Sequence, residues 1–436
     1  MLLSRKPVHD THRLMAWLCR SLVGLMLLAG CSGGGTPAGP TPQPAVIRFT
    51  ADAAYADTYP KLIEQFNKAH PGVTVQWVQV GGPGASSPLT CANCDVVRVN
   101  AQDLDDEQLS KYLSLDDIIS ASKGFKREDV APGTMEMFRY GGLQVAVPAG
   151  LNPAVAFYYP EVFQSHRVNP PTADWSLDDL AKTARTLGQA ATSNGGAPVY
   201  GFCSLPQSAD PVIFAYLFGG QLVDDPNTPT RPTLNSKANI EAVQWYADLR
   251  RIYAATPDPA EVERLFGGDI NRAIFGGRCG IWLGFYADHA RMASYLSNTG
   301  RQAPAMLPLP RGRTPFGVVR LEGYAILKNS QHVSAAWQWI QFMLAHPEAA
   351  EPLLPPEPAQ YRAKAFEAQV GKEVAAIATR LPDKLYVWSA NLDNPLLSRV
   401  AQAYLDAVAR VVLSQTDAES ALNNAQAQAA AVFKRP

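Results

Sequence analysis

The sequence predicts an α/β protein built on a parallel sheet, and its length predicts two domains. A short apolar strand at residues 46–50, an amphipathic helix at 57–69 and an alternating strand at 73–80 follow one another where folding begins. Strands and helices that alternate at these lengths pack as a parallel sheet with helices on its faces. Roughly 390 of the 436 residues follow the N-terminal leader and tether, which is too many for one ordinary domain and suits two.

Periodicity and turn residues set the bounds of these first elements. Tyr59, Leu62 and Phe66 recur at helical spacing on one face of the first helix, and His70-Pro71-Gly72 ends it. The run Asp95-Val96-Val97-Arg98-Val99 is expected to form the third strand.

The rest of the chain continues this alternation. Two short strands are expected at residues 144–148 and 154–159, around a turn at 149–153, and two buried strands at 199–203 and 279–283. Helices are expected to begin near Trp175 and to occupy residues 237–253, 334–345 and 416–433.

The first 31 residues are typical of an export signal. Basic residues precede the apolar run 22–29 and the small-residue sequence Leu28-Ala29-Gly30-Cys31, an order that marks secretory signals. The apolar run is much shorter than the roughly 20 residues that span a bilayer. We expect residues 1–30 to be a signal peptide and residues 31–45, rich in Gly and Pro, to be a flexible tether.

The sequence Leu-Ala-Gly-Cys also resembles the bacterial lipobox, in which the Cys is diacylated and becomes the mature N-terminus. This resemblance implies that Cys31 is the lipidation site and that two acyl chains hold the exported protein on the extracytoplasmic face of a bacterial membrane. A plain signal peptide in which a Cys happens to follow a Gly is the alternative.

Charge and motifs exclude several functional classes. The chain has 38 basic and 39 acidic residues, without the basic stripe that nucleic-acid binding requires. It lacks the G-x-S-x-G, H-E-x-x-H and P-loop patterns. The paired carboxylates Asp116-Asp117, Asp178-Asp179 and Asp224-Asp225 are adjacent in sequence, whereas a glycosidase pair must flank one bond. An exported hydrolase is therefore a disfavoured alternative, and no cofactor or metal is expected.

Four cysteines follow Cys31, namely Cys91, Cys94, Cys203 and Cys279. An even set in an exported protein indicates two disulfides, and we expect Cys91 to pair with Cys94 and Cys203 with Cys279. A thioredoxin-like or zinc-binding CxxC is the alternative for the first pair, although a lone CxxC is a weak metal signal.

Several segments occur in an order that matches a known family. They are FNKAHPGVTV, CDVVRVNAQDLDDEQLSKYLSLDDII, GGLQVAVPAGLNPAVAFYYPEVF, YGFC, FGGQLVDD, FGGRCGIWLG and EGYAILKNSQHVSAAWQWIQFML. In order and spacing they resemble the family 1 extracellular solute-binding proteins, the maltose-binding-like subunits of ABC importers. The chain departs from that pattern at Phe49-Thr50 and at Tyr158-Tyr159-Pro160, which affects the choice of ligand and leaves the fold unchanged.

The resemblance implies a periplasmic-binding-protein-like fold of two α/β lobes with a central ligand cleft. The chain would cross between the lobes three times, near Pro148, near Pro308 and around residues 345–356. Lobe 1 would comprise residues 46–148 and 309–345, and lobe 2 residues 149–308 and 346–436. A monomer is expected that captures a solute and delivers it to the transmembrane subunits of an ABC permease.

Candidate ligand-binding residues were sought where strands end, because parallel α/β sheets bind ligands at the carboxyl ends of their strands. Sugar recognition combines aromatic faces with carboxylates and amides. The candidates are Asp52, Asn100, Asn152, Gln207, Asp210, Trp282, Gly284, Tyr286, Glu322, Gly323, Tyr324, Tyr386, Trp388 and Asn391. Each has an alternative explanation as a core residue or in ordinary turn chemistry.

A mono- or oligosaccharide is the expected cargo, given the aromatic residues in this set. A glycerophosphodiester or a polyol is the alternative, for which Arg320 and Arg399 would supply the positive charge that a phosphate needs. A solute sensor that presents its closed form to a signalling receptor would have the same sequence features.

Overall fold

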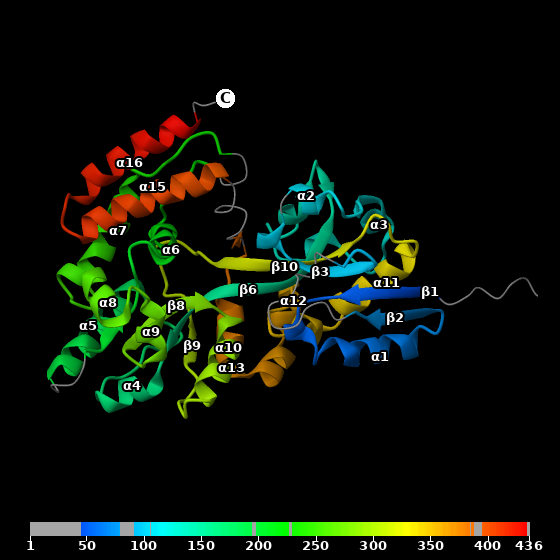
Figure 1. Ribbon diagram of the computed structural model, residues 1–436, viewed down its shortest axis with the longest axis horizontal. Helices are drawn as coiled ribbons and strands as arrows, with labels where there is room; N and C mark the ends of the chain where they lie inside the picture. Colours follow the sequence, from blue (N-terminus) through cyan, green and yellow to red (C-terminus); the bar gives the residue numbers. More distant parts are fainter. Residues whose placement is uncertain are drawn as a thin grey trace, which may run out of the picture. The chain divides into compact units, whose positions relative to one another are not determined.

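The computed structural model describes residues 45–78, 91–104, 106–193, 198–225, 229–383, 385–387 and 395–433 (Figure 1). These residues belong to one compact unit, Pro44–Pro436. The expected signal peptide and the predicted lipidation site, Cys31, lie outside the described residues.

A nine-stranded sheet organises the described part of the chain, in the order β2-β1-β3-β10-β6-β8-β7, with β11 beside β10 and β9 beside β6. Its strands are β1 (Ala45–Thr50), β2 (Val73–Trp77), β3 (Val96–Asn100), β6 (Ala146–Tyr158), β7 (Tyr200–Phe202), β8 (Cys279–Phe285), β9 (Ala305–Pro308), β10 (Val318–Ile326) and β11 (Tyr386–Val387). A separate hairpin joins β4 (Arg139–Tyr140) and β5 (Leu143–Gln144). The predicted parallel pairing holds for β1 with β2 and β3 and for β7 with β8, and β10 is also parallel to β11. In contrast, β10 runs antiparallel to β3 and β6, and β6 runs antiparallel to β8 and β9. The sheet is therefore mixed and not wholly parallel.

Helices cover both faces of this sheet. They are α1 (Tyr59–Ala69), α2 (Asp106–Leu109), α3 (Asp116–Ala121), α4 (Pro160–Ser165), α5 (Leu177–Ser193), α6 (Asp210–Leu217), α7 (Lys237–Arg251), α8 (Pro259–Phe266), α9 (Ile270–Phe275), α10 (Asp288–Ser297), α11 (Val333–Leu344), α12 (Pro358–Tyr361), α13 (Lys364–Arg380), α15 (Pro395–Val412) and α16 (Ala418–Phe433). Short 3-10 turns include η1 (Ala53–Tyr55), η3 (Ala101–Asp103) and η6 (Pro347–Ala350). Within the described residues no helix combines the length and the apolar character that a membrane span requires.

Residues 144–159 differ from the prediction of two short strands around a turn. The structure has one strand, β6, that continues through Pro148, Gly150 and Pro153. Strand β10 pairs with β6 from Ala146 to Pro153, and β8 takes over from Ala154. Pairing along the whole length outweighs the local turn signals of Pro and Gly, and a bulge between Glu322 and Gly323 absorbs the irregularity.

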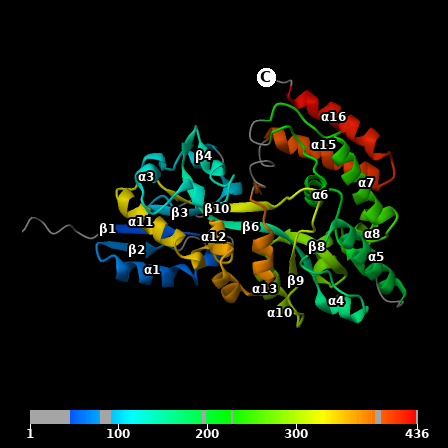
Figure 2. The same cartoon turned by 180° about the vertical axis from the view of Figure 1, so that it is seen from behind.

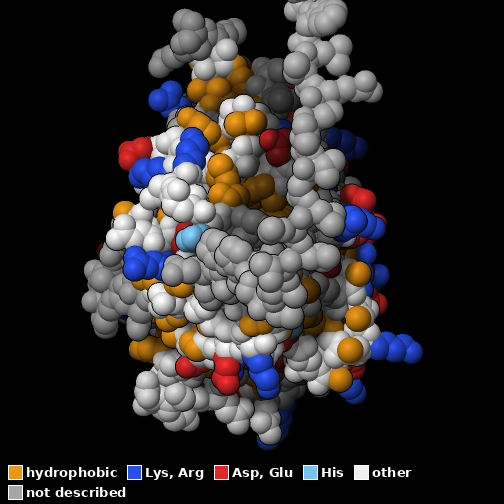
Figure 3. All heavy atoms as spheres, turned by 90° about the vertical axis from the view of Figure 1, so that its right-hand side faces the viewer, with side chains coloured by type: hydrophobic (Ala, Val, Ile, Leu, Met, Phe, Trp, Pro, Cys, Tyr) orange, Lys and Arg blue, Asp and Glu red, His pale blue; other side chains and the backbone are white. Residues whose placement is uncertain are grey.

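Two buried clusters form the core. The smaller one joins β1, β2, α1 and α11 around Phe49, Phe66 and Trp339. The larger one contains most of the remaining buried residues, including those of β8, α6, α7 and α15. Helices α15 and α16 lie side by side and contact α7 (Figures 1 and 2). The Ala-rich C-terminal helix thus packs against two other helices. On the face shown in Figure 3, acidic and basic side chains are interspersed.

Both expected disulfides are present. Cys91 is bonded to Cys94, and Cys203 to Cys279. The second bond joins the end of β7 to the start of β8 and so ties together two strands that are 76 residues apart in sequence.

Candidate functional site

Four polar side chains form a row across the centre of the sheet. Glu322 of β10 pairs with Asn100 of β3 on one side and with Gly150 of β6 on the other, and Arg320 pairs with Asn152. Residues in register on neighbouring strands, and residues two apart on one strand, point to the same face. Asn100, Arg320, Glu322 and Asn152 therefore share a face, and all four are half-buried. We call these four residues the central polar row.

Tyr286 lies at the end of this row. Its backbone N–H donates to the carbonyl of Pro153 at 2.8 Å, and the next residue, Ala287, donates to Asn152 Oδ1 at 2.9 Å. Burial, together with the negative charge of Glu351, raises the pKa of the Tyr286 hydroxyl to about 12. The hydroxyl is therefore protonated at neutral pH and can both donate and accept a hydrogen bond. Tyr286 is half-buried, and its backbone is held next to Asn152.

A buried ion pair holds Glu322, one residue of the central polar row. Arg98 Nε donates to Glu322 Oε2 at 2.6 Å, and Tyr55 donates its hydroxyl to the same oxygen at 2.6 Å. The guanidinium of Arg98 also donates to Tyr59 Oη and to the carbonyls of Ala349 and Ala350. The network thereby joins β3, β10, η1, α1 and η6. It holds the carboxylate of Glu322 in place within the row through two hydrogen bonds to Oε2.

A cavity of about 220 Å³ lies at the carboxyl ends of β7 and β8. The two strands are parallel neighbours, so their ends meet at one edge of the sheet, where α/β proteins bind ligands. The residues that line the cavity are Cys203, Ser204, Leu205, Ser208, Ala209, Asp210, Ile213, Ile270, Asn271, Ile274, Leu283, Gly284 and Phe285. Two predicted site residues, Asp210 and Gly284, are thus brought together from segments that are distant in sequence.

Phe285 connects this cavity with the central polar row. Phe285 lines the cavity, and Arg320 Cζ lies 3.9 Å from the centroid of its ring. At this distance a guanidinium interacts favourably with the ring face. Phe285 pairs with Ala154 on β6. The pairing of β8 with β6 therefore determines the position of Phe285 in the sheet. The row and the cavity therefore belong to one continuous region of the molecule.

Several other predicted residues lie in the core. Trp282 is 3% exposed and packs against Phe157 and Tyr159, with ring centroids 5.7 and 4.8 Å away. Tyr324 is 1% exposed, and its hydroxyl is 2.9 Å from that of Tyr59. Gly323 is buried, and a side chain there would meet the ring of Phe138 at 2.7 Å. In this structure these three positions therefore belong to the core.

The remaining candidates take separate places. Asp52 follows β1 and caps η1 by accepting from the backbone of Ala54 at 2.9 Å, while Gln207 is exposed in the loop before α6. Tyr386 packs against Tyr216, whose hydroxyl donates to it at 3.0 Å. Trp388 and Asn391 lie outside the described residues.

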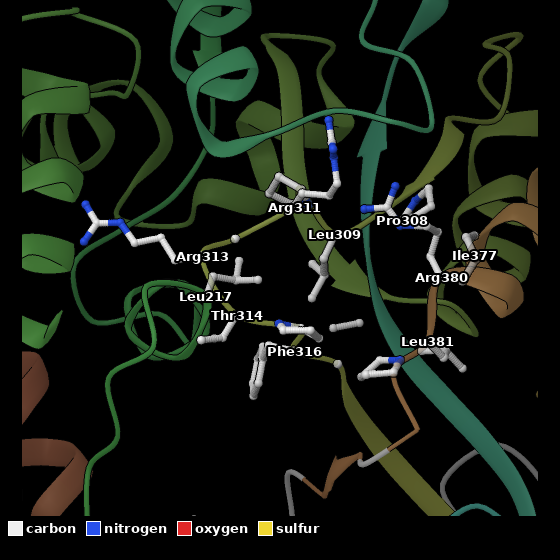
Figure 4. A pocket seen from close by; sticks show the side chains of 16 residues that line it. Leu217, Pro308, Leu309, Arg311, Arg313, Thr314, Phe316, Ile377, Arg380 and Leu381 are labelled. Atoms are coloured by element: carbon white, nitrogen blue, oxygen red, sulfur yellow. The ribbon is translucent and has the colours of Figure 1, made fainter.

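A second cavity, of about 430 Å³, lies under the loop between β9 and β10 (Figure 4). Its lining is mixed: apolar residues include Leu217, Leu309, Phe316, Ile377 and Leu381, and polar residues are Arg311, Arg313, Thr314 and Arg380. Its arginines are engaged elsewhere: Arg311 and Arg380 pair with Asp174, and Arg313 pairs with Glu241. This cavity lacks the convergent polar groups that mark a specific site for a polar ligand.

A family model of bacterial extracellular solute-binding proteins matches residues 52–350. This range is more than half of the chain and includes the central polar row and the cavity at β7 and β8. The chain belongs to this family. It is therefore a solute-binding protein, a component of transport that carries a solute and is not an enzyme.

Solved structures agree with the fold of this solute-binding protein. The cyclic α-maltosyl-1,6-maltose binding protein from Arthrobacter globiformis is similar with a TM-score of 0.68 and 16% identity, over 90% of this chain and 99% of that one. The sugar-binding protein MalE from Xanthomonas citri has a TM-score of 0.63 and 16% identity, over 89% and 97%. UgpB from Mycobacterium tuberculosis, in complex with glycerophosphocholine, has a TM-score of 0.64 and 15% identity, over 90% and 99%. At such identities the similarity shows a shared mixed α/β fold and not a shared ligand.

Proposed function

We propose that this solute-binding protein captures a carbohydrate between two lobes, at the central polar row, and delivers it to the membrane subunits of an ABC importer. The observation that carries this proposal is the half-buried row of Asn100, Glu322, Arg320 and Asn152, with the backbone of Tyr286 and Ala287 bound beside it. Amides, a carboxylate and a guanidinium that share one face suit the paired hydroxyls of a sugar, and the ring of Tyr286 suits its apolar face.

The two-lobe arrangement is supported by three segments that run side by side through the centre. Strands β6 and β10 pair along most of their length, and Leu354 bridges to Leu151 of β6. The expected first crossing near Pro148 falls within β6, and the third, residues 345–356, includes Leu354. We place the second crossing along β10 itself and not at Pro308, because residues 311 and 313 hydrogen-bond to Trp175 and Leu217, which belong to the proposed lobe 2. Lobe 1 then consists of residues 46–148 with 318–345.

A glycerophosphodiester is the alternative cargo, and Arg320 is the observation that favours it. Its guanidinium lies in the row and stacks over Phe285, and a planar guanidinium binds phosphate with two parallel hydrogen bonds. The carboxylate of Glu322 in the same row opposes an anion, although its charge is balanced by Arg98. The carbohydrate is therefore preferred. The proposed export and lipidation at Cys31 would place either cargo outside the cytoplasm.

Thermal unfolding of the full chain in detergent, against a panel of sugars, polyols and glycerophosphodiesters, tests the proposal. A ligand present at 100 times its dissociation constant stabilises the folded state by about 2.7 kcal/mol, a shift of about 2–4 °C or less for a chain of this size. A shift with sugars alone supports the carbohydrate. A shift with phosphodiesters alone replaces it with the alternative cargo.

Two variants localise the site. Tyr286→Ala and Asn152→Ala should each remove most of the ligand-induced shift. Tyr295→Ala is the matched control, because Tyr295 is 55% exposed and contacts Phe275 away from the row. An unchanged shift in both site variants would contradict the proposed location, whatever the cargo.

A further inference from the structure

The cavity at the carboxyl ends of β7 and β8 has a buried carboxylate on its lining. Asp210 is the first residue of α6, is 9% exposed and lines the cavity. Its carboxylate is hydrogen-bonded to the hydroxyls of Ser204 and Ser208. Burial raises the pKa of this carboxyl to about 6, which outweighs the opposite effect of the two serines. At neutral pH most molecules therefore hold a negative charge here.

No positive side chain balances that charge from the cavity wall. None of the thirteen lining residues is Lys, Arg or His, and all of them lie in the described part of the chain. The N-terminus of α6 supplies a partial positive charge, equivalent to about half an elementary charge. A buried carboxylate is ordinarily paired with a full opposite charge, because an unpaired one is costly in an apolar setting.

The apolar residues of the cavity lining make an unpaired carboxylate there more costly. Ile213, Ile274, Leu283 and Phe285 line the cavity with apolar surface, which lowers the local dielectric constant and strengthens any ion pair formed there. Asn271 and the two serines supply additional hydrogen-bonding groups. The volume of about 220 Å³ is about seven times the share of one water molecule in the liquid, so that a sugar-sized group fits and a single ion would leave space.

We propose that this cavity is a subsite for a cationic nitrogen of the solute and that the preferred cargo is an amino sugar, whose ammonium group pairs with Asp210. The inference rests on the proposed carbohydrate function and names a narrower class of substrate. The rest of the sugar would extend past Phe285 toward the central polar row, since that residue borders both regions.

Titration calorimetry on the full chain in detergent tests the inference with three disaccharides. They are the β-1,4-linked glucosamine disaccharide with free amines, its N,N′-diacetylated form and maltose. At pH 6.8 the free-amine disaccharide should bind at least tenfold more tightly than the other two. Asp210→Asn keeps the size of the side chain and removes its charge, and should reduce this preference to less than twofold.

Asp406→Asn is the matched control. Asp406 is exposed on α15, where it accepts from Gln402, and its change removes the same charge without touching the cavity. The tenfold preference should persist in this variant. Equal binding of all three disaccharides by the unchanged chain, or an undiminished preference in Asp210→Asn, would overturn the inference and leave the carbohydrate function standing. Binding of no sugar at all would overturn both.

A pH series on the unchanged chain keeps the test decisive if Asp210→Asn does not fold. From α7, Tyr246 faces Asp210 and is hydrogen-bonded to Ser204. From α9 and β8, the groups that face it are the uncharged residues of the cavity lining. Asp269 is the N-cap of α9. Of the carboxyls, Asp210 is the one that lines the cavity. The preference for the amine should therefore decline as the pH falls below the pKa of Asp210 in the complex, and a constant preference down to pH 4.5 would overturn the inference.

Discussion

Arg98 and Glu322 form a buried ion pair in which Arg98 Nε donates to Glu322 Oε2 at 2.6 Å. The side chain of Arg98 is 1% exposed and that of Glu322 is 17% exposed. The pair joins the neighbouring strands β3 and β10 and holds the one carboxylate of the central polar row. Because a charge left without its partner in the interior is costly, the stability of the fold should depend on both members.

Arg98→Met should lower the free energy of unfolding by about 3–5 kcal/mol, since it leaves Glu322 without its counter-charge and the carbonyls of Ala349 and Ala350 without their donor. Urea denaturation measures the change. Arg313→Met, which breaks the exposed pair with Glu241, should cost less than about 1 kcal/mol. Equal losses in the two variants would show that Arg98 is not a structural centre.

Glycine is required at position 201 by close packing of β7 on α5. A side chain there would lie 1.8 Å from the carbonyl oxygen of Ala184, and backbone cannot move aside as a flexible side chain can. Gly201→Ala should therefore destabilise the protein by about 1–3 kcal/mol or more. Gly72→Ala has no neighbour within 4 Å and should change stability by less than about 0.5 kcal/mol. A neutral Gly201→Ala in the same denaturation assay would contradict the packing of α5 on β7.

The two disulfides should contribute unequally. The bond between Cys203 and Cys279 closes a segment of 76 residues, and that between Cys91 and Cys94 closes one of three. Loop-closure entropy assigns about 4.5 kcal/mol to the first and about 1.6 kcal/mol to the second. The double variant Cys203→Ala with Cys279→Ala should therefore lose about 3 kcal/mol more than Cys91→Ala with Cys94→Ala. Similar losses would mean that residual structure in the unfolded chain, and not loop length, governs the effect.

The sequence predicted the positions of the regular elements well where local periodicity and packing agree. Helix α1 and strands β2 and β8 begin within two residues of their expected positions, because apolar spacing and the turn His70-Pro71-Gly72 act locally. Strand β6 was missed as one element, because its continuity depends on β10, which is more than 160 residues away in sequence. Long-range pairing of this kind leaves no mark in the local pattern of Pro and Gly.

The candidate site was predictable only in part, for the same reason. Asn100, Asn152 and Glu322 could be named because each lies in or beside a run of strand-forming residues, and the structure aligns them on one face. The local sequence marks Arg98 only as a strand residue, because a charged residue between two valines does not indicate which residue it pairs with. Ser204, Ser208 and Asn271 were not singled out, because only the tertiary fold brings α9 to the end of β7. The one local signal is that Ser204 and Ser208 lie six and two residues before the predicted Asp210.

The carboxyl of Asp210 should make the stability of the protein depend on pH in a definite direction. Its pKa in the folded state is raised to about 6, above the ordinary Asp value of about 3.9 that it regains on unfolding. The folded state therefore binds more protons than the unfolded state between pH 4 and 6, and this group lowers the free energy of unfolding as the pH rises through that range. The full effect is about 3 kcal/mol, and most of it has developed by about pH 6.5.

Asp210→Asn removes this contribution, because an amide does not titrate. The free energy of unfolding of the variant, relative to the unchanged chain, should rise by up to about 3 kcal/mol from pH 4 to pH 6.5 and then stay constant. Urea denaturation at four or five pH values measures the difference, and Asp406→Asn should show no comparable rise because its carboxylate is exposed on α15. Parallel pH profiles for Asp210→Asn and the unchanged chain would mean that the pKa of Asp210 is the same in the folded and unfolded states, so that burial in the cavity does not disfavour its carboxylate.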